Sequence, residues 1–98
     1  MQNMGALVAE MQKLQAELRN KVIEVVEGNG AVKIKMNGHQ EVVGLTVAPD
    51  LLAGGDTQRL ELLLAAALNR AIHESKQMIQ TEIARKTGFA LPQWTDGR

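Results

Sequence analysis

Cysteine is absent from this 98-residue sequence, and aromatic side chains are scarce, with one Phe, one Trp and no Tyr. Without cysteine there can be no disulfide, no cysteine-type zinc site and no thiol nucleophile. With so few aromatics, a hydrophobic core must be built from aliphatic side chains, which are plentiful because 45% of the residues are hydrophobic. The composition therefore predicts one small aliphatic domain, and it fits a reducing compartment.

Two further absences bear on location and partners. No stretch approaches the ~18 uninterrupted apolar residues of a membrane span, and the first residues lack the basic and apolar segments of a signal peptide. We therefore expect a cytoplasmic protein with no membrane partner. The formal net charge is zero, from 11 basic and 11 acidic residues, so composition alone gives no electrostatic argument for a nucleic-acid partner.

Hydrophobic periodicity predicts one helix near each end of the chain. The first helix ends at about Asn20 and has an apolar stripe at spacings of three and four. The members of this stripe are Met4, Leu7, Met11, Leu14 and Leu18. The second helix is predicted from Thr57 to about Lys86, with Asp56 as its N-cap and Gly88 as its C-cap. Its first half, Leu60 to Leu68, is apolar almost all round and is expected to be buried on more than one side.

Alternation of apolar and polar residues between the helices predicts three antiparallel strands, Val22–Glu27, Ala31–Met36 and Gln40–Val47. We expect a two-residue type I′ turn at Asn37-Gly38, with Gly38 at positive φ. This register predicts one continuous apolar face. Its members are Ile23, Val25, Val32, Ile34, Met36, Val43, Leu45 and Val47. The opposite face mixes lysines with apolar residues, so we expect it to be partly covered.

The dimensions of these elements predict an assembly of two chains. A helix of ~30 residues is about 45 Å long, whereas the strands reach about 25 Å at most. The second helix must therefore extend beyond any sheet that one chain can build. We expect the two helices to pair beyond the sheet while a second copy covers the remaining apolar surface. The prediction is a homodimer with helical arms that project from a central sheet.

The sequence offers no constellation that is typical of catalysis or metal binding. His39 and His73 have no other ligand-type residue at metal-binding spacing. His73 and Ser75 are two apart on a helix, so they lie on different faces and form no catalytic pair. Gly28-Asn29-Gly30 lacks the Lys and Ser/Thr of a phosphate-binding loop and is better explained as a turn. We expect no enzyme activity, cofactor, metal or small-molecule substrate.

Basic residues are mildly concentrated on the two predicted helices, and a dimer would double this charge. The candidates for DNA contact are Lys13, Arg19, Lys21, Arg70, Lys76, Arg85 and Lys86. The same residues are also explained by an ordinary solvated helix surface, with Glu82 and Lys86 as a surface ion pair. On the residues alone, the solvated surface is the favoured interpretation.

Several ordered segments resemble the YbaB/EbfC family of bacterial nucleoid-associated proteins. They are "MQKLQAEL" in the first helix, "VKIKMNG" in the hairpin, "VAPDLL" after the third strand, "LLAAALNRAIHESK" in the second helix and "LPQW" near the end. The resemblance runs from about Met4 to Pro92. It implies the α+β class, an α-β-β-β-α fold with a three-stranded antiparallel sheet and two long helices, and a tweezer-like homodimer. It also implies one domain over residues 1–92, followed by a C-terminal tail at 93–98.

The resemblance further implies a function on DNA. Members of this family bind duplex DNA with little sequence specificity, alter its conformation, and take part in nucleoid organisation, DNA protection or gene regulation. We therefore expect a DNA-binding homodimer in the bacterial cytoplasm and nucleoid. The alternative is a dimeric adaptor whose arms bind another protein without direct DNA binding. A salt series discriminates between them, because phosphate contacts weaken steeply as salt rises.

Overall fold

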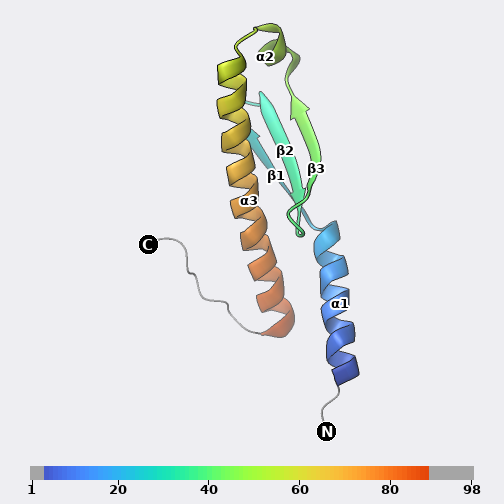
Figure 1. Cartoon of the computed structure of the whole chain (residues 1–98). Coiled ribbons are helices and arrows are strands. Elements are labelled where there is room, and N and C mark those ends of the chain that lie inside the picture. Colours follow the sequence, from blue (N-terminus) through green and yellow to red (C-terminus); the bar gives the residue numbers. More distant parts are fainter. Residues whose placement is uncertain (1–3, 89–98) are drawn as a thin grey trace.

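The computed structural model describes residues 4–88 and confirms the predicted order of helix, three strands and helix. Its elements are α1 (Met4–Asn20), β1 (Val22–Glu27), β2 (Val32–Asn37), β3 (Val42–Val47), α2 (Pro49–Ala53) and α3 (Thr57–Thr87) (Figure 1). The short helix α2 was not predicted, and Pro49 begins it because the first helical turn needs no amide hydrogen there. The predicted tail at 93–98 lies outside the described residues.

The strands form one antiparallel sheet in the order β1-β2-β3, and α3 packs across one face of it. The core between them consists of Val25, Val32, Ile34 and Met36 from the sheet, with Ala67 and Ala71 from α3. The two alanines let the helix approach the sheet closely, and both are fully buried. The helix covers β1 and β2 rather than β3. Leu45 of β3 consequently remains 55% exposed although it pairs with the buried Ile34.

The connection between β2 and β3 differs from the predicted two-residue turn. Its loop has three residues, closed by a hydrogen bond from Asn37 N to Glu41 O (3.0 Å), and the positive φ falls on Gln40 instead of Gly38. The Asn37 side chain explains this shape, because its Oδ1 accepts from the amides of His39 and Glu41. The register shifts between Lys35 and Met36, so that Met36 pairs with Val42, and Val43 does not join Met36 on the apolar face as predicted.

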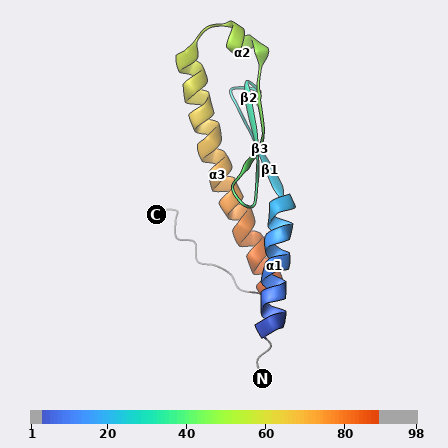
Figure 2. The ribbon, with the colours of Figure 1, turned by 45° about the vertical axis from the view of Figure 1, so that its right-hand side comes forward.

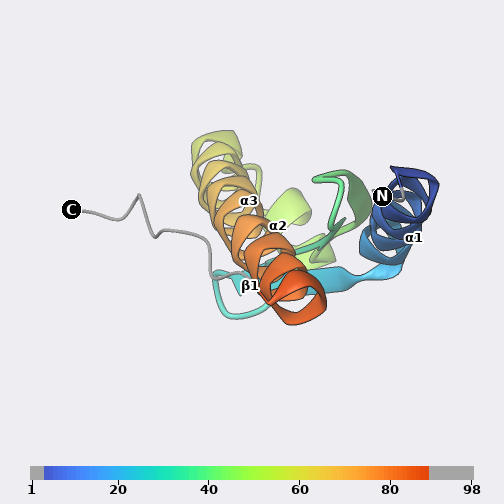
Figure 3. The ribbon, with the colours of Figure 1, turned by 90° about the horizontal axis from the view of Figure 1, so that it is seen from below.

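The long helix passes well beyond the end of the sheet, as its length requires. Its 31 residues correspond to about 46 Å, while each six-residue strand spans about 20 Å. Beyond the sheet α3 runs alongside α1 in the opposite direction (Figures 1 and 2). Figure 3 shows the two helices standing apart, with β1 running from the end of α1 towards α3. We refer to α1 together with residues 76–87 of α3 as the arm.

The molecule is elongated and leaves much apolar surface uncovered. Its principal extents are 65 × 30 × 16 Å and its radius of gyration is 17.4 Å, against about 12–13 Å for a compact domain of this length. Exposed apolar residues lie on the strands and on the outside of α3, and we call them the outer apolar surface. They are Val22, Val26, Val42, Val43, Leu45, Leu62, Leu68 and Ile72. Within residues 4–88, no helix is both long and apolar enough to traverse a lipid bilayer.

Candidate nucleic-acid interface

The base of the arm is held by close backbone contact between α1 and the β2–β3 loop. Gly38 N donates to the carbonyl oxygen of Leu18 at 2.8 Å, and His39 Nε2 donates to the carbonyl oxygen of Gln15, also at 2.8 Å. Gly38 is buried, and a Cβ added to it would lie only 2.5 Å from the Leu18 oxygen. The direction in which α1 leaves the sheet is therefore determined by the hairpin loop.

On the other helix, Ser75 fastens α3 to the end of the sheet. Its side chain is completely buried, and its hydroxyl donates to the carbonyl oxygen of Asn37 at 2.8 Å. A buried hydroxyl that is already bonded to the backbone is structural, because it has no exposed oxygen to act as a nucleophile and no base beside it. The arm therefore starts from two fixed points, Gly38 beneath α1 and Ser75 on α3.

Ion pairs join the two helices of the arm. Lys86 of α3 lies 2.9 Å from Glu17 of α1, and Lys21 lies 3.2 Å from Glu82. Arg85 binds the other carboxylate oxygen of Glu82 at 2.6 Å. Hydrogen bonding by Arg85 and then by Lys21 lowers the pKa of Glu82, and hydrogen bonding by Lys86 lowers the pKa of Glu17. These cations connect the helices to each other, and Lys86 reaches across to Glu17 rather than pairing with Glu82 as predicted.

Arg70 lies beside the sheet rather than on the arm, where the sequence analysis had placed it. Its guanidinium donates to the Glu27 carboxylate at 2.6 Å and to the carbonyl oxygen of Val26 at 3.1 Å. Glu74 lies 3.6 Å from its second nitrogen. The hydrogen bond to Glu27 raises the pKa of Arg70 further. Arg70 thus attaches α3 to β1, and a phosphate would have to displace two carboxylates to reach it.

Three of the predicted contact residues remain available. Lys13, Arg19 and Lys76 are exposed and form no ion pair with any residue in the range 4–88. Lys13 and Arg19 lie on α1, and Lys76 is the first residue of the arm on α3. By contrast Lys21, Arg70, Arg85 and Lys86 all have carboxylate partners. The candidate interface is therefore smaller than the sequence suggested.

The sheet carries a second group of cations that the sequence analysis did not consider as DNA contacts. Lys33 and Lys35 are exposed on β2, on the face opposite to α3. The alternation of these lysines with apolar residues along the strand predicts that both point to that face. Glu24 of β1 lies opposite Lys35 in the sheet register. Since Val22 and Val26 of the outer apolar surface share this part of the sheet, the face combines charge with apolar area.

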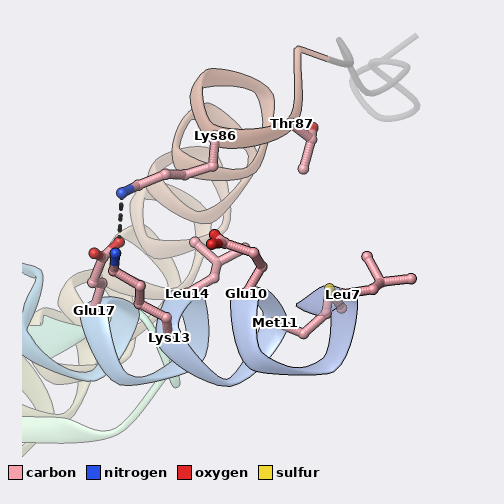
Figure 4. Close-up of a pocket in the computed structure, with 8 residues that line it drawn as sticks. All are labelled: Leu7, Glu10, Met11, Lys13, Leu14, Glu17, Lys86 and Thr87. Carbon is pink, nitrogen blue, oxygen red and sulfur yellow. Dashed lines mark ion pairs between the residues drawn. The ribbon is translucent and has the colours of Figure 1, made fainter. Parts of the chain in front are cut away.

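A groove separates α1 from the last turn of α3. It has a volume of about 430 Å³ and is lined by Leu7, Glu10, Met11, Lys13, Leu14, Glu17, Lys86 and Thr87. Figure 4 shows the α1 side chains along one side, with Lys86 reaching across to Glu17. No group of three or more His, Asp or Glu side chains that could hold a metal ion occurs in the described part of the chain. The arm thus offers cations and an apolar groove.

Comparison with known proteins identifies this architecture. A sequence model of the YbaB/EbfC DNA-binding family matches residues 1–90. A nucleoid-associated protein from Alkaliphilus oremlandii is 40% identical over 93 residues, covering 88% of this chain and 82% of that protein. Another from Moorella thermoacetica is 37% identical over 88 residues, covering 90% and 85% respectively. The crystal structure of an uncharacterized Helicobacter pylori protein matches in fold, with a TM-score of 0.66, 22% identity, and coverage of 84% and 94%.

Proposed function

The chain belongs to the YbaB/EbfC DNA-binding family, and from this premise we propose that it acts as a homodimer whose arms hold duplex DNA on the bacterial nucleoid. The observation that carries the proposal is the match of the family over nearly the whole chain, residues 1–90. Binding depends on contacts with DNA phosphates, because the arm offers isolated cations. Contacts of this kind require little reading of base edges and no recognition helix. The protein changes the shape of DNA and performs no chemistry on it.

The cations without carboxylate partners are the proposed phosphate contacts. Lys13, Arg19 and Lys76 can meet a phosphate at no cost to an existing ion pair. Arg85 and Lys21 leave Glu82 less readily, because the Glu82 side chain is only 8% exposed and its carboxylate would lose its compensating charge. We therefore assign Lys21, Arg70, Arg85 and Lys86 to holding the arm in place and the other three to DNA.

The outer apolar surface supports the proposed homodimer. Leu62 is 67% exposed on α3, and Val43 and Leu45 are 52% and 55% exposed on β3. Exposed apolar area of this extent is typical of a protein interface. A second copy that covered α3 and β3 would bring two arms into one particle. Light scattering should give about twice the 10.7 kDa chain mass, and Leu62→Glu should shift the protein towards single chains.

The DNA contacts are tested by titrating unrelated duplexes at several salt concentrations. The Lys13→Gln/Arg19→Gln double variant should lower the slope of log affinity against log salt by about two, one for each contact. Lys33→Gln/Lys35→Gln is the matched control, because it removes the same charge from the sheet. Arg85→Gln/Lys86→Gln should also weaken binding, but it should lower the melting temperature at the same time, since both residues hold the arm.

Two results would contradict this assignment. If the Lys33→Gln/Lys35→Gln variant lost slope while the double variant on α1 did not, DNA would lie on the sheet and not on the arms. If the parent failed to shift duplex DNA even at low salt, the arms would have to bind a protein, and the adaptor function would replace the present proposal.

A further inference from the structure

The β2–β3 loop lies against the last turns of α1 (Figure 1), and a polar hollow is found between them. We call it the α1–loop hollow. Its lining residues are Gln12, Gln15, Ala16 and Arg19 of α1 and His39 of the loop, and its volume is about 220 Å³. A second hollow of about 420 Å³ shares Gln15 and His39 with it. One water molecule occupies about 30 Å³ of liquid, so the α1–loop hollow has room for a phosphate group and several waters.

Helix periodicity and one hydrogen bond position the residues of the α1–loop hollow. Gln12, Ala16 and Arg19 are four and three positions apart, so they share one face of α1. The 2.8 Å hydrogen bond from His39 Nε2 to the Gln15 carbonyl oxygen holds the loop against this face. The guanidinium of α1 and the imidazole of the loop therefore line the same hollow, although the two residues are 20 positions apart in the chain.

The charges around His39 favour an anion in this hollow. Among the described residues that line the two hollows there is no carboxylate, and Arg19 forms no ion pair with any residue in the range 4–88. The acidic residue of the hairpin, Glu41, lines neither hollow and accepts a hydrogen bond from Asn37 Nδ2 at 2.8 Å. From α3 the loop is approached by the uncharged Ser75, which bonds to the Asn37 carbonyl oxygen. A guanidinium among side-chain amides matches the oxygens of a phosphate.

The hydrogen bond of His39 decides what its ring can do for a phosphate. A carbonyl oxygen only accepts, so Nε2 carries a proton and Nδ1 of the neutral ring is an acceptor that disfavours a phosphate oxygen. Nδ1 has no hydrogen-bond partner within residues 4–88. When the ring takes up a second proton, Nδ1 becomes a donor and a positive charge joins that of Arg19. Histidine side chains generally take up this proton between about pH 8 and pH 5.

We propose that the α1–loop hollow binds a phosphate of duplex DNA, held by Arg19 and by the protonated ring of His39. This inference rests on the proposed function and adds the β2–β3 loop to the DNA interface. A duplex is favoured over a free phosphate ion because Lys13 lies on the same helix, about 9 Å from Arg19 along its axis. One duplex can contact both cations, whereas one phosphate ion cannot.

The test is the affinity of the full-length protein for duplex DNA at about pH 8 and pH 5.5, over a salt series in phosphate-free buffer. The parent should bind severalfold more tightly at the lower pH, with a slope of log affinity against log salt that is larger by about one. His39→Gln should remove this pH dependence, because an amide keeps a donor for the Gln15 carbonyl oxygen but gains no proton. His73→Gln is the matched control, since His73 is the only other histidine and is exposed on α3. It should retain the pH dependence of the parent.

A second pair of variants tests the hollow without altering the loop contact. Gln12→Glu places a carboxylate in the hollow and should weaken DNA binding severalfold more than Gln58→Glu. Gln58 is exposed at the start of α3, so its substitution adds the same charge at a distance from the hollow. Circular dichroism of each variant verifies that the helices remain folded.

Failure of this inference can be distinguished from failure of the proposed function. A parent that binds DNA equally at both pH values, or a His39→Gln variant that keeps the pH dependence, would overturn the inference alone. If His39→Gln lowered affinity by the same factor at both pH values, its role would be structural and the inference would also be wrong. A parent that binds no duplex at either pH would overturn both. If millimolar inorganic phosphate moved the NMR signals of the His39 ring as the duplex does, and displaced the duplex at constant ionic strength, the hollow would be a site for free phosphate instead.

Discussion

Gly38→Ala is expected to lower the free energy of unfolding by about 1–3 kcal/mol, through overpacking at the base of the arm. The added Cβ would lie 2.5 Å from the Leu18 carbonyl oxygen and 2.9 Å from the Leu18 Cβ. Backbone atoms cannot rotate away as a flexible side chain could, so α1 and the hairpin loop must separate. The separation also stretches the 2.8 Å hydrogen bond from Gly38 N to Leu18 O.

For a domain of this size, such a loss corresponds to a drop in melting temperature of roughly 5–20 °C. Calorimetry or circular dichroism at constant protein concentration measures it. Gly44→Ala is the matched control, because Gly44 has no positive φ and its nearest neighbour, the Lys35 Cβ, would lie at 3.6 Å. That substitution should be neutral or slightly stabilising, since glycine inside a strand costs conformational entropy.

A third substitution separates close packing from backbone conformation as the reason for glycine. If Gly38 were needed for a positive φ, as the two-residue turn required, asparagine would be tolerated well. Because close approach is the reason, Gly38→Asn should be at least as destabilising as Gly38→Ala. A Gly38→Ala protein that melts within a degree or two of the parent would refute the reasoning.

Three other substitutions and one titration test the remaining contacts. Ser75→Ala should cost about 0.5–1.5 kcal/mol in urea unfolding, because the carbonyl oxygen of Asn37 loses the Ser75 hydroxyl and keeps the amide of Gln40 as its donor. Asp56→Ala should cost about 0.5–2 kcal/mol, since its side chain caps the start of α3 through Arg59 N. Because the pKa values of Glu17 and Glu82 are lowered in the folded state, their stabilising contribution is complete above the usual pKa of about 4.3 and is lost as the pH falls through the folded values. Glu82→Gln should therefore flatten the acid side of a plot of melting temperature against pH.

Local pattern was sufficient to predict the two long helices, the three strands and the buried side of β1 and β2. The alternation that placed Val25, Ile34 and Met36 on one side depends only on the period of a strand, and all three are buried. The caps of α3 at Asp56 and Gly88 were predicted in the same way, because capping depends on residues adjacent in the chain.

What could not be predicted depends on contacts between distant residues. The close contact of the β2–β3 loop with α1 depends on Leu18, which lies 20 positions before Gly38 in the chain and offers its carbonyl oxygen there. In the same way, the sequence alone suggested that Arg70 was an unpaired cation of the arm. In the folded chain its guanidinium lies 2.6 Å from the Glu27 carboxylate. Sequence spacing shows a charge pair within one helix, such as Glu82 and Arg85, but gives no sign of a partner 43 residues away.

Arg70 also affects how this protein avoids aggregation. β1 is an edge strand of the sheet, and the free peptide groups of an edge can template the addition of a strand from another molecule, which begins fibre growth. The guanidinium of Arg70 occupies the Val26 carbonyl on this strand and holds Glu27 beside it. An incoming strand would have to expel the guanidinium before it could bond there, so Arg70 hinders the addition of a strand at Val26.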